Sequence, residues 1–454
     1  MELREAISKG RMTPFQFRVV LICILLTVVD GYEILVAAFT LPALVREWNL
    51  TETQVGLVAS IGTLGMGLGA AFLSPLADRW GRRRHILLSL VAIIIGMTLS
   101  GLAPSYTAFL IFRFFAGLFL GGIVPSINAL VSEYASDERR GTVMGVYGIG
   151  FPLGAAIGGV LSIALISAFG WHGPYLFSAA VTLILLIWAY FALPESVGYL
   201  VERRPKGALE TYNKIGAKMG VAPATELPPA TSGQQKVNLL SALQGIMLRR
   251  TILLWISYGL LTGAFYFANG YTARLVAQST GNDNIGITAQ ALVAAGGVIG
   301  ALVFAFLSAK IHPRMVTVAL MVFGTVAFFL FASFFTNPSV VFILAVLVGL
   351  AVNGGIAAYY AISPPIYPTT IRASAVGLMM GIGRVVAFLA PNIAAFLLNR
   401  GLTAPNVYQV YGIVLLVAAG AVFLLHRTYT GANKLDAMET ESAMAAQKQQ
   451  AATQ

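Results

Sequence analysis

The sequence predicts an all-α membrane protein with twelve transmembrane helices. Of its 454 residues, 57% are hydrophobic and only 10% are charged, and the mean hydropathy is +0.80. A soluble domain carries about 25% charged residues, so this chain has too little charge to cover a surface in water. Its apolar residues fall into blocks close to the ~20 residues with which a helix spans a bilayer. These observations exclude a soluble enzyme.

Charged residues and Pro or Gly divide the chain into twelve apolar blocks. The predicted spans are 17–41, 53–77, 86–103, 106–134, 141–169, 173–194, 251–279, 287–309, 315–336, 339–366, 371–399 and 405–426. The long interruption after the sixth span predicts four parts, which are an N-terminal six-helix bundle (1–195), a cytoplasmic linker (196–250), a C-terminal six-helix bundle (251–427) and a disordered tail (428–454). Apolar residues at helical spacing in 207–220 predict an amphipathic helix on the membrane surface.

Lysine and arginine are distributed unequally between the two sides of the predicted bundles. Of the 29 residues, 24 lie on the side of the N-terminus, counting Arg18 and Arg372 at the first turns of their spans, two lie on the other side and three fall deeper within spans. Cytoplasmic loops of membrane proteins are enriched in these residues, so both termini and the linker are expected in the cytoplasm. The net charge of +11 therefore reflects topology, and no nucleic acid is expected as a partner.

The two halves carry an internal repeat at an offset of about 232 residues. Arg140-Gly-Thr-Val-Met-Gly145 aligns with Arg372-Ala-Ser-Ala-Val-Gly377, and Gly121-Gly-Ile123 aligns nearby with Gly354-Gly-Ile356. Chance similarity between Gly- and Ala-rich helices is the alternative, but the matching order at nearly one offset favours duplication. The repeat predicts two pseudo-symmetric six-helix bundles that rock around a site in the middle of the membrane.

Other kinds of chemistry have no signature in this sequence. It contains no phosphate-binding loop motif, no His, Asp or Glu spacing typical of a metal site and no Ser-His-Asp candidate, and its single cysteine, Cys23, lies in the first apolar block. We therefore expect no cofactor, no metal and no enzyme activity, and transport driven by a gradient. A membrane sensor is the alternative from another class, but the tail offers no folded effector domain.

The loop after the second span resembles a motif of the major facilitator superfamily. Residues 74–84 read SPLADRWGRRR, which is similar to the family pattern G-x-x-x-D-R-x-G-R-R with Ser74 in place of the first glycine. The resemblance implies the major facilitator fold and a latch in which Asp78 pairs with a nearby arginine, Arg140 being the candidate, and locks one access state. A positively charged turn without a gating role is the alternative. The expected gating residues are Asp78, Arg79, Arg82, Arg83, Glu133, Arg140 and Arg372.

Three further motifs resemble the aromatic acid:proton symporter branch of this superfamily. They are Asp30-Gly-Tyr-Glu33, Pro194-Glu-Ser196 and Tyr367-Pro-Thr-Thr-Ile-Arg372. The first motif usually ends in Asp in that branch, whereas it ends in Glu33 here. The resemblance implies a monomeric proton symporter for a small aromatic carboxylate, such as a hydroxybenzoate, in the inner membrane of a bacterium. The alternative is a symporter or antiporter for another organic anion such as a sugar acid.

Charged residues inside the predicted spans are the candidates for the mechanism. Asp30 and Glu33 share one face of the first helix, and at ~1.5 Å per residue Asp30, Arg113 and Arg384 all lie about 20 Å from the cytoplasmic end, which predicts one chamber. We expect the carboxylates of Asp30 and Glu33, tuned by Arg113, to carry the proton, and Arg384 with Arg113 to bind the substrate carboxylate. The alternatives are a structural ion pair in the first half and a salt bridge between the halves. Arg274 is expected at the outer membrane interface.

Aromatic and amide side chains in spans one, seven and ten are expected to complete the substrate pocket. Their rings would stack on an aromatic substrate, and their hydroxyl or amide groups would contact its substituents. Taken singly, each also fits a packing role. The candidates are Tyr32, Tyr266, Asn269, Asn353, Tyr359 and Tyr360.

Overall fold

The structure is a computed structural model that describes residues 3–9, 12–229, 245–367 and 372–429. Within these residues the regular structure is entirely helical, and twelve helices are long and apolar enough to cross a membrane. This confirms the predicted fold class and the number of spans.

The twelve long helices follow each other in two sets of six. The first set is α2 (Pro14–Trp48), α3 (Glu52–Phe72), α5 (Arg82–Gly101), α6 (Tyr106–Tyr134), α7 (Arg140–Phe169) and α8 (His172–Ala192). The second set is α11 (Gly245–Thr280), α12 (Asp283–Ser308), α13 (Pro313–Ser333), α14 (Pro338–Ile362), α15 (Arg372–Asn399) and α16 (Ala404–Arg427). The short helices are α1 (Leu3–Lys9), η1 (Ser74–Leu76), α4 (Ala77–Trp80), α9 (Val197–Arg203), α10 (Ala208–Lys218) and η3 (Pro364–Ile366).

The first helix extends further than the hydrophobic pattern predicts. It begins after Thr13, which forms a capping box with Gln16, and it continues through Pro42 to Trp48. Proline is tolerated inside membrane helices because neighbouring groups satisfy the freed backbone. The helix ends where Asn49 adopts a left-handed conformation with φ 48°. Residues 42–48 therefore belong to the helix, although the predicted span ended at residue 41.

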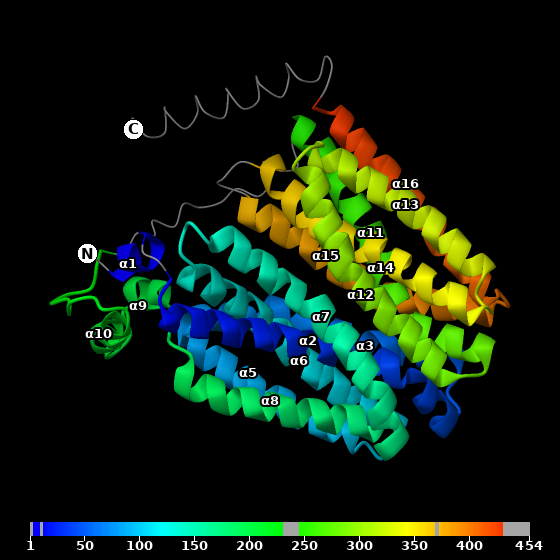
Figure 1. Ribbon diagram of the computed structural model, residues 1–454, viewed down its shortest axis with the longest axis horizontal. Coiled ribbons are helices and arrows are strands. Elements are labelled where there is room, and N and C mark those ends of the chain that lie inside the picture. The colour runs from blue at the N-terminus through cyan, green and yellow to red at the C-terminus, as the bar shows by residue number, and fades with distance from the viewer. Residues whose placement is uncertain (1–2, 10–11, 230–244, 368–371, 430–454) are drawn as a thin grey trace.

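The short helices α1, α9 and α10 lie together at one end of the first bundle (Figure 1). We call this end of the molecule the linker face and the opposite end the distal face. Helix α10 corresponds to the expected amphipathic helix, and its buried side is formed by Ala208, Tyr212, Ile215 and Gly216. Because the long helices alternate in direction, α2, α7, α11 and α15 all start at the linker face.

Glycines allow close contacts between helices within each bundle. In the first bundle, Gly65 and Gly69 of α3 approach the backbone of α6 so closely that an added Cβ would overlap it. In the second bundle, Gly296 and Gly300 of α12 approach the backbone of α14 in the same way. These contacts match the G-x-x-x-G spacing, which serves helix packing in membranes.

The two bundles contact each other near the distal face. Gly159 of α7 packs against Ala291 of α12, and Ala395 of α15 packs against Gly56 of α3. Helix α11 also packs along α2. The contact of α7 with α12 is therefore repeated by the equivalent contact of α15 with α3, and α2 packs against its equivalent α11, as expected for two repeated halves.

Near the linker face, the same helix faces have no neighbours among the described residues. Gly141, Gly145 and Gly148 lie on the stripe of α7 that includes Gly159, and a Cβ added at any of them would meet no described atom within 4 Å. Gly377 and Gly381 of α15 have equally open surroundings. The molecule is therefore closed between the bundles at the distal face and open between them at the linker face.

Candidate functional site

Glu33 is buried inside the first bundle, with 2% of its surface exposed. Its Oε1 accepts hydrogen bonds from the Ser178 and Thr182 hydroxyl groups, both at 2.7 Å. These two residues are one turn apart on α8, a helix that packs against α2, α5 and α7. The Glu33 carboxylate therefore points into the first bundle and away from the second.

Arg113 lies beside Glu33 but does not contact its carboxylate. The Arg113 Nη2 donates to the backbone oxygen of Glu33 at 3.2 Å, and its Nη1 lies 3.3 Å from the sulfur of Met97. Its guanidinium also lies 5.6 Å from the centre of the Tyr175 ring and lines a small pocket with Gly62 of α3. Because Arg113 is only 3% exposed, its charge acts on Glu33 through a medium that screens it weakly.

Asp30 lies at the interface between the bundles. It is 7% exposed, and its Oδ1 has no hydrogen-bond partner among the described residues. Asp30 interacts electrostatically with Arg384 of α15 and with Tyr147 of α7. No direct ion pair joins Asp30 to Arg384, since none of the described pairs within 4.0 Å includes either residue. The carboxylate and the guanidinium therefore face each other across the interface without touching.

Arg384 is surrounded by tyrosines of the second bundle. Its Nη1 donates to the Tyr266 hydroxyl at 2.9 Å, and it interacts electrostatically with Tyr258 and Tyr360. The aliphatic part of Arg384 packs on Gly67 of α3. Tyr360 is 58% exposed, which places it at the space that opens toward the linker face. Arg384 therefore presents a cation between the two bundles within a set of phenol rings.

The four expected charges form two neighbouring clusters rather than a single chamber. Asp30 and Arg384 lie at the interface between the bundles, whereas Glu33 and Arg113 lie inside the first bundle. Counting residues along each helix gave the depth of these side chains but not the direction in which they point. A spacing of three residues turns Glu33 by about 60° from Asp30, and this turn directs it toward α8.

Four of the predicted pocket residues have packing roles in this conformation. Tyr32 donates to the Pro174 backbone oxygen at 3.1 Å and stacks on Phe39 within the first bundle. Tyr359 is fully buried against Tyr258. The other two, Asn269 and Asn353, donate to backbone oxygens one turn earlier in their own helices.

Tyr266 and Tyr360 remain as pocket residues, and the structure adds two that the sequence interpretation missed. Tyr258 lies eight residues before Tyr266 on α11, so the two share one face of that helix. This spacing could have identified Tyr258 as a pocket residue from the sequence. Tyr147 lies on α7 beside Asp30, and no pattern in the sequence distinguished it from other tyrosines.

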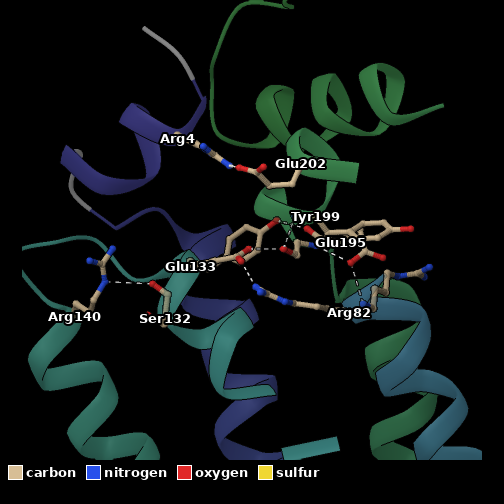
Figure 2. Close-up of polar contacts among 11 residues, drawn as sticks. Arg4, Arg82, Ser132, Glu133, Arg140, Glu195, Tyr199 and Glu202 are labelled. Atoms are coloured by element: carbon tan, nitrogen blue, oxygen red, sulfur yellow. Dashed lines mark hydrogen bonds and ion pairs between the residues drawn. The ribbon is translucent and has the colours of Figure 1, made fainter. Parts of the chain in front are cut away.

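Several expected gating residues form a polar cluster at the linker face of the first bundle (Figure 2). Arg82 at the start of α5 forms an ion pair with Glu133 at the end of α6, and the Ser196 hydroxyl donates to the other oxygen of Glu133 at 2.7 Å. The Arg83 backbone N–H donates to Glu195 at 3.0 Å, and its guanidinium donates to the Leu193 backbone oxygen at 2.7 Å. This cluster fixes α5, α6 and the end of α8 to one another.

Glu195 belongs to this cluster, although it was recognised only as part of a family motif. Burial raises the pKa of Glu195, and the backbone N–H groups of Arg83 and Ser196 oppose that effect by hydrogen bonding to the carboxylate. The acid therefore takes up a proton at a higher pH than an exposed glutamate does.

The expected latch between Asp78 and Arg140 is not formed in this conformation. Arg140 forms an ion pair with Asp137 at 2.9 Å and donates to the Ser132 backbone oxygen at 3.3 Å. Asp78 is exposed and forms no ion pair with a described residue. Of Arg79, only the backbone oxygen takes part, as acceptor from the Tyr199 hydroxyl at 3.1 Å. The side chain of Arg372 lies outside the described residues.

Polar contacts between the bundles close the distal face. Both terminal guanidinium nitrogens of Arg274, Nη1 and Nη2, donate to the carboxylate of Glu52, at 2.6 and 2.5 Å. Arg46 donates to Asp283 at 2.6 Å. Two further hydrogen bonds, from Asn392 to Ser60 at 2.8 Å and from Asn399 to Thr53 at 3.0 Å, also join α15 to α3. We call these four contacts the distal lock. Arg274 is thus a partner in the lock and is only 6% exposed, in contrast to the expected position at the membrane interface.

Comparison with known proteins identifies the family. The sequence matches the family description "Major Facilitator Superfamily" over residues 21–283 and 254–450. The chain belongs to this superfamily. Solved structures with a similar fold include a partially occluded inward-open conformation of the xylose transporter XylE from E. coli, with a TM-score of 0.70, 16% sequence identity, and coverage of 90% of this chain and 97% of that chain.

Curated relatives of this member of the superfamily are named as transporters. The 4-hydroxybenzoate transporter PcaK of Pseudomonas aeruginosa is 29% identical over 93% of this chain and 95% of its own length. The benzoate transport protein of Acinetobacter baylyi is 26% identical, covering 94% and 93%. The niacin transporter NiaP of the same species is 29% identical, covering 94% and 97%. These names agree with the expected family and with a transporter rather than an enzyme.

The distal lock predicts that removing one acidic charge shifts the conformational equilibrium of this transporter. Glu52→Gln removes the charge that Arg274 pairs with, and charge-assisted hydrogen bonds contribute about 1.5–3 kcal/mol each. We expect the distal face to open more often, so that a cysteine introduced by Ala395→Cys, buried against α3, reacts at least about tenfold faster with a maleimide in detergent.

The only native cysteine, Cys23, is fully buried and gives a low background in this assay. Gly381→Cys, on the open part of the same helix, is the matched control and should already react rapidly without the Glu52→Gln substitution. An unchanged labelling rate at position 395 would show that the Arg274 pair does not hold the distal face closed.

Proposed function

We propose that this protein is a proton symporter that imports a small aromatic carboxylate across the inner membrane of a bacterium, with its linker face in the cytoplasm. The observation that carries the proposal is the position of Arg384. Its guanidinium lies between the bundles, bonds to Tyr266, and faces Asp30 without an ion pair. The site therefore offers a cation, an acid without an ion pair to a described residue, and aromatic rings in the place where a rocking transporter binds its cargo.

The substrate carboxylate would bind to Arg384. A guanidinium presents donors in a planar fork that suits a carboxylate, and the bond to Tyr266 orients this fork. The rings of Tyr258, Tyr266 and Tyr360 supply surfaces for an aromatic plane. The names of the relatives support this substrate class, since hydroxybenzoate, benzoate and niacin are all aromatic carboxylates. A sugar acid fits less well, because Asn269 and Asn353 direct their amides to their own helices.

The proton would be carried by Asp30. With the substrate absent, the charges of Asp30 and Arg384 balance across the interface. Entry of a substrate anion adds a negative charge in a region of low dielectric constant, and a proton on Asp30 restores the balance. Glu33 lies one turn away and holds its carboxylate on two hydroxyl groups, so it would act as a second proton station inside the first bundle.

The described conformation corresponds to the inward-open state under this proposal. The linker face is open and the distal lock is closed. In the outward-open state the contacts of the distal lock would break. The open stripes of α7 and α15 would then pack against the other bundle, and Asp78 would pair with Arg140. Both ends thus use ion pairs that exist in one state only, which is the condition for a switch between two states.

Uptake into proteoliposomes tests the coupling. Labelled 4-hydroxybenzoate should accumulate in wild-type vesicles when the outside is more acidic, and labelled sugar acids should not. In Asp30→Asn the gradient should give no accumulation, whereas exchange of labelled for unlabelled substrate should persist because that exchange needs no net proton movement. Glu210→Gln on the exposed side of α10 is the control and should behave as wild type. Accumulation by Asp30→Asn equal to that of wild type would contradict the role of Asp30.

Binding to the purified protein tests the role of Arg384. Arg384→Lys keeps the charge but removes the planar fork, so the affinity for 4-hydroxybenzoate should fall at least about tenfold, the loss expected from one charge-assisted hydrogen bond. Arg400→Lys, an exposed arginine at the distal end of α15, is the matched control. Isothermal titration calorimetry in detergent measures both. Equal affinities of Arg384→Lys and wild type would remove Arg384 from the substrate site.

A further inference from the structure

The linker ends of α11, α13 and α16 meet in a group of basic side chains. We call Arg250, Arg314, His312 and His426 the basic cluster. The guanidinium carbons of Arg250 and Arg314 each lie 3.6 Å from the centre of the Tyr429 ring. Two guanidinium groups at this distance must occupy opposite faces of the ring, because they would overlap on one face. The rings of His312 and His426 lie 5.0 Å apart beside them.

The basic cluster has hydrogen-bond donors without an acidic partner among the described residues. Arg250 is 2% and Arg314 is 8% exposed. Arg250 donates to the Thr428 hydroxyl and backbone oxygen, but the Arg314 guanidinium has no hydrogen bond to a described residue, and the buried Nδ1 of His426 has no partner there either. Burial and the neighbouring Arg314 and His426 hold the pKa of His312 below its usual range. Within the described part of the chain, the cluster is therefore a region of positive charge that lacks a counter-ion.

The sequence of the second bundle cannot supply that counter-ion. From residue 245 to residue 429 the chain contains one acid, Asp283. Asp283 begins α12 at the distal face, where it pairs with Arg46. Two buried guanidinium groups without a carboxylate at their end of the bundle are energetically costly.

The internal repeat shows that two acids near Arg82 in the first bundle have no counterpart near Arg314 in the second. At the offset of 232 residues, Arg82 of the first bundle corresponds to Arg314 of the second. Arg82 forms an ion pair with Glu133, and Glu195 lies close by. The residues that correspond to these two acids are Pro365 and Arg427. The first bundle thus neutralises its arginine internally, whereas the second bundle has the matching arginine and neither of the matching acids.

We propose that the basic cluster binds the phosphate group of an anionic phospholipid. Arginine forks match phosphate oxygens, and basic pockets at the cytoplasmic ends of membrane helices suit anionic head groups. Exposed apolar side chains within three residues of cluster members along the chain would contact the acyl chains, namely Leu248, Ile252, Ile311, Phe423 and Leu424. A free phosphate ion offers similar oxygen acceptors but has no acyl chains for this apolar surface. The lipid phosphate would neutralise Arg314 in the second bundle as Glu133 neutralises Arg82 in the first.

The test uses the full-length protein, purified in detergent, with phosphatidylglycerol or phosphatidylcholine added. Native mass spectrometry should show preferential binding of phosphatidylglycerol, which should also raise the melting temperature more than phosphatidylcholine does. Arg314→Gln should weaken the apparent affinity for phosphatidylglycerol about fivefold, the effect of removing one basic residue near a lipid surface. Arg249→Gln removes the same charge from an exposed neighbour of Arg250 and should leave the preference intact.

Three results would overturn the proposal. The first is equal binding of the two lipids by wild type, or an unchanged preference in Arg314→Gln. The second is an equal rise in melting temperature with inorganic phosphate, which would indicate a free-anion site. The third concerns the tail acids Asp436, Glu439 and Glu441. If neutralising them destabilises the protein as Arg314→Gln does and lipid affects neither variant, the tail fills the site. If Arg314→Gln fails to fold, Arg314→Lys replaces it in the test. Arg314→Lys should bind phosphatidylglycerol more weakly than wild type does, but should still bind phosphatidylglycerol more strongly than it binds phosphatidylcholine.

Discussion

The cost of placing a charge in a bilayer governs the arrangement of this protein. A charged side chain within the hydrocarbon region must find a partner or a proton. Glu33 meets this demand with two hydroxyl groups of α8, and Arg384 meets it in part with the Tyr266 hydroxyl. Asp30 has no such partner for its Oδ1 among the described residues. The acid that is least satisfied thus lies at the interface between the two halves, where a moving boundary can change its surroundings.

The same constraint explains the contacts at the two ends of the molecule. Glu52 and Asp283 begin helices at the distal face, and the arginines that pair with them come from the opposite bundle. Because these pairs join the halves, they last only while that face is closed. At the linker face the ion pair of Arg82 with Glu133 stays within one bundle, so it stabilises the bundle in either state. Ion pairs between bundles bias the state, and ion pairs within a bundle hold its shape.

The fold could be predicted from the sequence because its main determinants are local. The length of each apolar block and the internal repeat predicted twelve helices in two sets, and the structure contains twelve such helices among the described residues. The direction of side chains was harder to predict. Depth placed Asp30, Arg113 and Arg384 at one level, but the packing of α2 against α8 directs Glu33 inward, and Arg113 of α6 points toward Met97 of α5 and the backbone of Glu33. The pair of Glu52 with Arg274 joins residues 222 positions apart, and no sequence pattern links them before the chain is folded.

Distances between the two bundles test the account most directly. One pair of spin labels, at Gly145 and Gly377, reports on the linker face. A second pair, at the exposed residues Ser167 and Asn284, reports on the distal face. Double electron–electron resonance measures the distance within each pair. Addition of 4-hydroxybenzoate at acidic pH should shorten the first distance and lengthen the second in part of the population. If both distances stay unchanged, or if both lengthen together, the bundles do not alternate around the site between Asp30 and Arg384.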